Sequence, residues 1–149
     1  MPVAHAFLQA KEDLEALAPQ VAAAQLWQKP GGAASIGFHL RHIGGATERL
    51  LTYARGEALT PDQIAAAKRE AVEMPGMDAL LREVMAALDA ALEQVRTTAR
   101  ESLLEERRVG RAGLPSTTLG LLFHAAEHAT RHVGQAITTA RILSGSQVP

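Results

Sequence analysis

The sequence predicts an all-α protein of one domain, residues 1–149, folded as a four-helix bundle. Its 149 residues are enough for one hydrophobic core and too few for two. Alanine and leucine dominate the composition, only five residues are aromatic, and β-branched residues are sparse, which is typical of helical proteins. Apolar residues also recur at spacings of three and four in four long segments, as in amphipathic helices.

The first long helix is expected to begin at Pro2, because proline is favoured in the first turn of a helix. Its predicted buried face consists of Phe7, Ala10, Leu14, Leu17 and Val21. Pro19 lies within this pattern and predicts a kink or a division, because proline cannot continue helical hydrogen bonding. The sequence therefore does not fix where this helix ends, and the end can lie as late as Trp27.

The second long helix is expected to run to about Arg55. Ser35 is its predicted N-cap, and Gly56 follows at the position where glycine commonly ends a helix. Its buried stripe is predicted to contain Ile36, Leu40, Ile43, Thr47, Leu50 and Ala54.

Residues 56–76 are expected to cross over between the second and third long helices. Thr60, Pro61 and Asp62 match the cap and first turn of a short helix that continues to about Glu73. A connection of this length would allow the second and third long helices to run parallel.

The third long helix is predicted over residues 77–100, and its buried face contains Leu80, Leu81, Val84, Leu88, Ala91, Leu92 and Val95. Residues 105–115 are expected to form a polar loop, broken by Gly110, Gly113 and Pro115. The arginines of this loop either bind an anionic group or are simply solvated; they are Arg107, Arg108 and Arg111.

The last long helix is predicted to begin after a cap at Ser116 or Thr117 and to reach about Leu143.

Charge and cysteine content exclude several classes of protein. The formal net charge is −1 and no basic stripe is present, so we do not expect nucleic acid as a partner. Without cysteine the chain has neither a disulfide framework nor a thiolate metal ligand. Apolar stretches are interrupted well before the ~18 residues that a membrane span needs. We therefore expect a soluble, unprocessed cytoplasmic protein that does not bind membranes.

Five of the six histidines fall into two clusters: His39 and His42 on the second long helix, and His124, His128 and His132 on the last. Residues four apart on a helix have Cβ atoms only ~5–6 Å apart, so two imidazoles can bind the same ion. A third ligand must come from another helix. Periodicity mildly favours His39, whereas His42 lies further round the helix, toward Arg49 and Tyr53; geometry does not decide between them.

Three neutral imidazoles with an open coordination position are typical of a catalytic divalent site rather than a closed structural one. The structural alternative is that the histidines lie at the edge of the core and bond to carbonyls or carboxylates. A di-iron carboxylate site is excluded, because no glutamate in the chain is followed by histidine at i+3.

Two segments resemble the DinB-like family, also called the DinB/YfiT metalloenzymes. Residues 35–43, Ser-Ile-Gly-Phe-His-Leu-Arg-His-Ile, resemble the family's second-helix ligand segment, whose histidine falls on His42. Residues 124–135 are similar to its His-x-x-x-His-x-Gly-Gln signature, with the ligands on His128 and His132. Arg131 and Val133 differ from the residues often found at those positions and leave the inferred ligands unchanged.

The resemblance implies a bundle of up-down-down-up topology with a crossover between the second and third long helices. It also implies a homodimer and a nickel or zinc site formed by His42, His128 and His132. It favours His42 over His39. His39 and His124 remain candidates for a further contribution to the site.

The resemblance further implies a thiol-dependent transferase acting on a small-molecule substrate. The metal would bind a low-molecular-weight thiol, such as bacillithiol or mycothiol, as a thiolate that attacks an electrophile. The alternatives are a hydrolase or isomerase that uses metal-bound water, and a stress-related metal-binding module without enzymatic activity. No catalytic base or substrate pocket can be named from the sequence.

Overall fold

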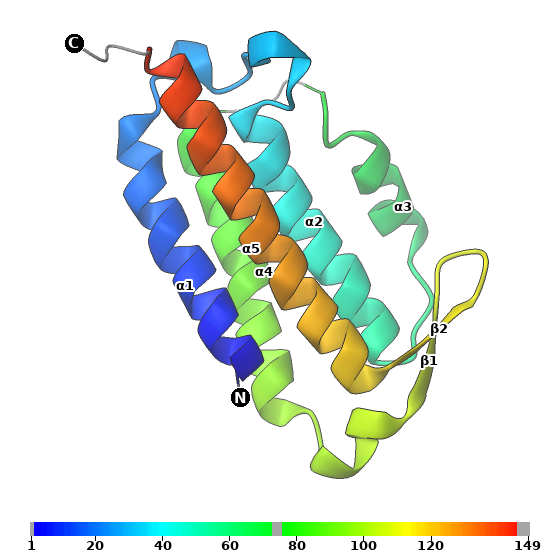
Figure 1. The fold of residues 1–149 in the computed structure, drawn as a ribbon. Helices are drawn as coiled ribbons and strands as arrows, with labels where there is room; N and C mark the ends of the chain where they lie inside the picture. The colour runs from blue at the N-terminus through cyan, green and yellow to red at the C-terminus, as the bar shows by residue number, and fades with distance from the viewer. Residues whose placement is uncertain (1, 73–75, 146–149) are drawn as a thin grey trace.

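The protein is mostly helical and carries one small two-stranded sheet. The computed structural model describes residues 2–72 and 76–145. In that part of the chain the α-helices and strands are α1 (Pro2–Leu17), α2 (Ile36–Ala54), α3 (Pro61–Lys68), α4 (Met77–Thr97), β1 (Glu106–Val109), β2 (Leu114–Thr117) and α5 (Thr118–Leu143). Figure 1 shows the four long helices α1, α2, α4 and α5 side by side, with α3 and the two strands on the outside.

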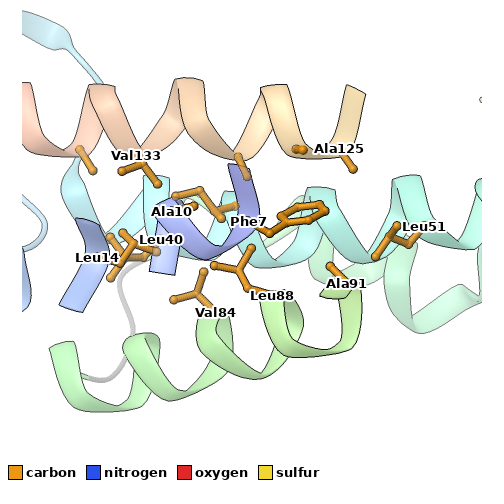
Figure 2. Close-up of a cluster of buried hydrophobic side chains, with 14 of the residues drawn as sticks. Phe7, Ala10, Leu14, Leu40, Leu51, Val84, Leu88, Ala91, Ala125 and Val133 are labelled. Atoms are coloured by element: carbon orange, nitrogen blue, oxygen red, sulfur yellow. The ribbon is translucent and has the colours of Figure 1, made fainter. Parts of the chain in front are cut away.

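One hydrophobic core lies between the four long helices. Both α1 and α2 pack against α4 and α5. The core includes Phe7, Leu14, Leu40, Val84, Leu88 and Val133 (Figure 2). Near the end of α2, Leu51 is buried and the predicted Leu50 is only partly buried, because the stripe advances by four residues from Thr47 and drifts slowly around the helix.

Pro19 divides the N-terminal segment, as one of the two predicted alternatives had it. Helix α1 ends at Leu17, and Pro19 lies in a single 3-10 turn, Ala18–Gln20. The backbone of Val21 is extended, with φ −104° and ψ 112°. The helical stripe therefore stops before Val21, whose side chain is only partly buried.

The helix caps fall where the sequence placed them. The Ser35 hydroxyl accepts a hydrogen bond from the backbone N–H of Phe38 (3.2 Å) at the start of α2. The Thr60 hydroxyl accepts from the backbone N–H of Gln63 (3.2 Å), and the Gln63 side chain accepts from that of Thr60 (3.0 Å).

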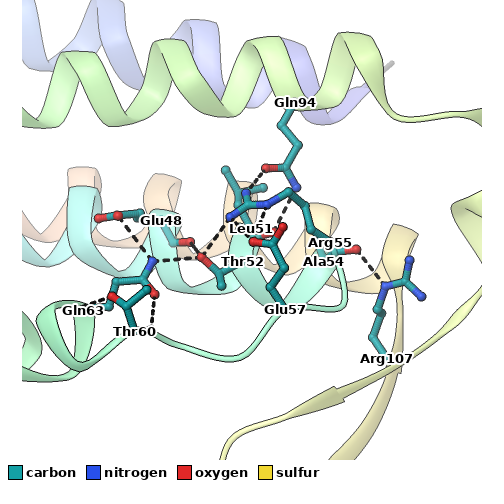
Figure 3. Close-up of polar contacts among 10 residues, drawn as sticks. All are labelled: Glu48, Leu51, Thr52, Ala54, Arg55, Glu57, Thr60, Gln63, Gln94 and Arg107. Atoms are coloured by element: carbon teal, nitrogen blue, oxygen red, sulfur yellow. Dashed lines mark hydrogen bonds and ion pairs between the residues drawn. The ribbon is translucent and has the colours of Figure 1, made fainter.

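Helix α3 is tied to α2 and is shorter than expected. The Gln63 amide donates to the Thr52 hydroxyl at 2.9 Å, which holds α3 against α2 (Figure 3). The helix ends at Lys68, whereas the predicted end, Glu73, lies outside the described residues. Helix α4 also ends early, at Thr97, where Thr98 turns into an extended conformation.

Residues 106–117 form a β-hairpin, which corrects the predicted loop and the all-α assignment. Strands β1 and β2 pair antiparallel, with Glu106 opposite Thr117. Gly110 and Gly113 at the ends of the turn have φ values of 68° and 59°, a region that favours glycine. They are turn residues of a hairpin and not only breakers within a polar loop.

Arg107, one of the three loop arginines, binds the protein itself. Its Nε donates a hydrogen bond to the carbonyl of Ala54 (2.8 Å) at the C-terminus of α2 (Figure 3). Its Nη2 lies 2.8 Å from Glu105 Oε2. Carbonyls at a helix C-terminus lack intrahelical partners, so Arg107 caps α2 and fixes the hairpin to it.

Among the helices that the structure describes, none combines the length and the hydropathy needed to cross a bilayer.

Candidate metal centre

Helices α2 and α5 pack together and bring three histidines into one group. The Nε2 atoms of His42 and His128 are 2.9 Å apart. The ring centroid of His132 lies 4.5 Å from that of His42 and 4.6 Å from that of His128. One ring nitrogen from each residue falls within 4.8 Å of the others. The three histidines that the family resemblance implies as ligands therefore lie close together.

The other two histidines of the predicted clusters lie outside this group of three. His39 is buried, and its Nδ1 is 3.1 Å from Nδ1 of His132. It therefore stands behind His132 as a hydrogen-bonding partner. The side chain of His124 is about half exposed, and its Nδ1 is 3.4 Å from Glu127 Oε2.

Hydrogen bonds identify the ring nitrogens that face the centre of the group. His42 Nδ1 lies 2.6 Å from Glu70 Oε2, and a carboxylate only accepts, so Nδ1 carries the proton. The other ring nitrogen of His42, Nε2, faces His128. Nδ1 of His132 bonds to His39, so Nε2 is the nitrogen of His132 that is left for a ligand.

Glu70 is the part of the site that sequence reasoning missed. It follows α3 in the crossover and is buried against α2, where its Oε1 accepts a hydrogen bond from Arg49 (2.7 Å). Burial raises the pKa of Glu70, but hydrogen bonds from His42 and Arg49 outweigh it and hold the pKa below its usual value. One signal was available: His42 and Arg49 are seven residues apart and share a helix face, so both can reach a common acidic partner.

Burial and neighbouring histidines favour the neutral form of His128 and His132. Burial lowers the pKa of His132 to about 4, with further contributions from His42, His128 and His39. Burial, assisted by His42, lowers the pKa of His39 to about 4 in the same way. The pKa of His128 is also lowered, first by burial and then by neighbouring His42. Neutral imidazole is the form that binds a metal ion.

The three histidines of the group could hold a divalent metal ion. Core-edge histidines bonded to carboxylates would account for His42, which has Glu70, but not for His128. Nδ1 of His128 is buried and has no hydrogen-bonding partner among the described protein atoms. A buried nitrogen without a partner is destabilising by about 1–3 kcal/mol, and an ion or water molecule at the site is one explanation for it. Three neutral imidazoles are a donor set for zinc, nickel and other transition-metal ions.

Comparisons with known proteins agree with the predicted family. The sequence profile of the DinB superfamily matches residues 6–136, which include α2 and the three histidines. A search of curated protein sequences found no match. A solved structure of a DinB-like protein from Bacillus cereus ATCC 10987 has a TM-score of 0.69 at 16% identity, over 93% of this chain and 91% of that chain. That likeness concerns the fold, and the profile match over most of the chain shows that the protein belongs to the DinB superfamily.

Proposed function

We propose that the protein is a metal-dependent enzyme in which His42, His128 and His132 bind one nickel or zinc ion. The observation that carries this proposal is the convergence of three imidazole nitrogens, from two helices, within 4.8 Å of one another. Two of them stand four residues apart on α5, the spacing at which neighbouring imidazoles reach a common ion. Three protein ligands leave a coordination position for a reactant.

We infer that the scaffold is a single-domain four-helix bundle of up-down-down-up topology. The colour gradient in Figure 1 runs in one direction along α1 and α5 and in the opposite direction along α2 and α4. The packing of α1 and α2 against both α4 and α5 supports the same arrangement. The crossover that contains α3 accounts for the parallel course of α2 and α4.

The reaction we propose is the transfer of a thiol to a small electrophilic substrate. A divalent ion in this site would lower the pKa of a thiol, or of water, that occupies its open position. The chain has no cysteine, so the sulfur would come from a low-molecular-weight thiol such as bacillithiol or mycothiol. The role of the protein is to hold the three imidazoles of His42, His128 and His132 close together.

A spectroscopic titration of the cobalt(II)-substituted protein tests the proposed reaction. We expect bacillithiol or mycothiol to produce a thiolate-to-cobalt absorption band in the wild-type protein and none in His128→Ala. The S-methylated thiol, which cannot ionise, is the matched control and should leave the spectrum unchanged.

A cobalt spectrum that responds to none of the thiols would contradict thiol transfer. Turnover of an ester or an isomerisable substrate in the same sample would then favour the hydrolase or isomerase alternative. A metal-loaded protein without turnover of any substrate, whose His-to-Ala variants lose only stability, would favour the non-enzymatic metal-binding module.

Homodimer formation, which rests on the family resemblance, and a cytoplasmic location, which rests on the lack of cysteine and of long apolar stretches, complete the proposal. Sedimentation velocity of the full chain tests the first, with a species of twice the chain mass as the expected result. A monomer at all concentrations would contradict it.

A further inference from the structure

A buried ion-paired carboxylate stands behind one of the three candidate ligands. Glu70 is 7% exposed, although its side chain comes from the crossover segment rather than from a long helix. Each carboxylate oxygen of Glu70 has a different partner: Oε2 lies 2.6 Å from His42 Nδ1, and Oε1 lies 2.7 Å from Arg49 Nη1. A buried carboxylate without such partners would be strongly destabilising, so both contacts fix its place.

We propose that Glu70, held by Arg49, is a positioning residue that fixes the tautomer and the orientation of His42 toward His128 and His132. The inference rests on the proposed metal site. A carboxylate bonded to Nδ1 keeps the proton there and turns the lone pair of Nε2 inward, as outer partners of metal-binding histidines commonly do. Phe38 holds the face of the same ring, with stacked planes 12° apart and centroids 5.2 Å apart.

Helix α2 leaves space for this ion pair by means of a glycine. A Cβ atom at Gly45 would lie 2.6 Å from Glu70 Oε1 and 2.8 Å from Arg49 Nη1, both closer than real Cβ contacts allow. Gly45 lies inside α2, where glycine is a poorer helix former than alanine. The position therefore gives the carboxylate room to approach α2, and it offers a way to disturb Glu70 without altering a ligand.

Zinc and cobalt titrations of the metal-free chain by calorimetry test the inference. We expect Glu70→Gln, which keeps the shape and removes the charge, to weaken metal affinity by about 10–100-fold with unchanged stoichiometry. Gly45→Ala should weaken affinity in the same direction by displacing the carboxylate. The controls are Glu48→Gln, which changes an exposed carboxylate on α2, and Gly44→Ala, where a Cβ would make only ordinary contacts at 3.6 Å or more.

Imidazole 15N chemical shifts of the metal-free protein give a readout that needs no metal. We expect His42 to be the Nδ1–H tautomer in the wild-type protein and a mixture of tautomers in Glu70→Gln. Unchanged affinity and an unchanged His42 tautomer in Glu70→Gln would overturn the inference and leave the proposed function intact. If the wild-type protein binds no metal, the proposed function fails, and the tautomer of His42 alone then decides the role of Glu70.

Discussion

At the scale of single residues, His39 is expected to support a metal ligand rather than to be one. Its Nδ1 contacts Nδ1 of His132, and it lies outside the group of three. We therefore expect His39→Ala to weaken zinc affinity by about 10-fold and to leave the stoichiometry unchanged. His39→Gln restores a hydrogen-bonding side chain and should recover part of that loss.

Calorimetric zinc titrations of the metal-free variants provide the measurement, with His132→Ala as the comparison that should abolish binding. If His39→Ala also abolishes binding while the chain remains folded, His39 is a ligand. That result would favour the weak periodicity argument that placed His39 at the centre of the α2 stripe.

The single residues of the site differ in how far the sequence could predict them. His128 and His132 follow from a local rule, because side chains four apart on a helix are neighbours. The choice of His42 over His39 needed the family resemblance, since both lie near the same helix face. Glu70 is 28 residues from His42, and its contact depends on the path of the crossover after α3, which no local pattern fixes.

At the scale of the elements, the start of α2 depends on a close contact with Trp27. A Cβ atom at Gly37 would lie 2.8 Å from three ring atoms of Trp27, and the Gly37 N–H donates to the carbonyl of Leu26 at 2.8 Å. Gly37→Ala should therefore lower the free energy of unfolding by about 1–3 kcal/mol, although alanine is the better helix former. Urea unfolding measures this change.

Gly134→Ala is the matched control for this contact. Gly134 lies inside α5, where an added Cβ meets no described atom within 4 Å, so the substitution should stabilise the protein by up to about 1 kcal/mol. Equal stabilisation by Gly37→Ala and Gly134→Ala would show that Trp27 does not pack on α2.

The hairpin offers a second prediction at this scale. Arg107→Ala removes the hydrogen bond to the Ala54 carbonyl, and we expect a loss of about 1–2 kcal/mol in the free energy of unfolding. Arg108→Ala, on a side chain that is 67% exposed, should change it by less than about 0.5 kcal/mol. Equal effects in urea unfolding would contradict the capping role of Arg107.

The starts of the helices were more predictable than the hairpin because their signals are local. Ser35 and Thr117 are caps that can be read directly from the chain. The strands have only four residues each and one contains Pro115, which cannot donate to the ladder and weakens any strand assignment. The contact between Arg107 and α2 that holds the hairpin is tertiary, so sequence patterning could not show it.

At the scale of the whole molecule, the packing of the core and metal binding at the candidate site are expected to contribute independently to stability. Leu88 is fully buried on α4, a helix that contributes none of the three histidines. Leu88→Ala should lower the free energy of unfolding by about 2–5 kcal/mol. Zinc at 100 times its Kd should raise that free energy by about 2.7 kcal/mol in both the wild-type protein and Leu88→Ala.

Chemical unfolding with and without zinc measures both effects, and His42→Ala is the control in which zinc should give little stabilisation. If zinc stabilised His42→Ala as much as the wild-type protein, the ion would bind elsewhere.

The sequence was sufficient to predict four long amphipathic segments and one core, because periodicity shows which face of each helix is buried. It could not show which neighbour covers that face. The stripe of α2, for example, is equally compatible with packing on α1 or on α5. Only the crossover length restricted the arrangement, and the directions of the helices came from the family resemblance.

The binding of one ion by His42, His128 and His132 is tested most directly by elemental analysis. The protein should be purified without an affinity tag or chelator, beside the His128→Ala/His132→Ala double variant. We expect near-stoichiometric nickel or zinc in the wild-type protein and none in the variant. A wild-type protein that is metal-free and takes up no added nickel or zinc would contradict a metal centre and leave the histidines with a structural role.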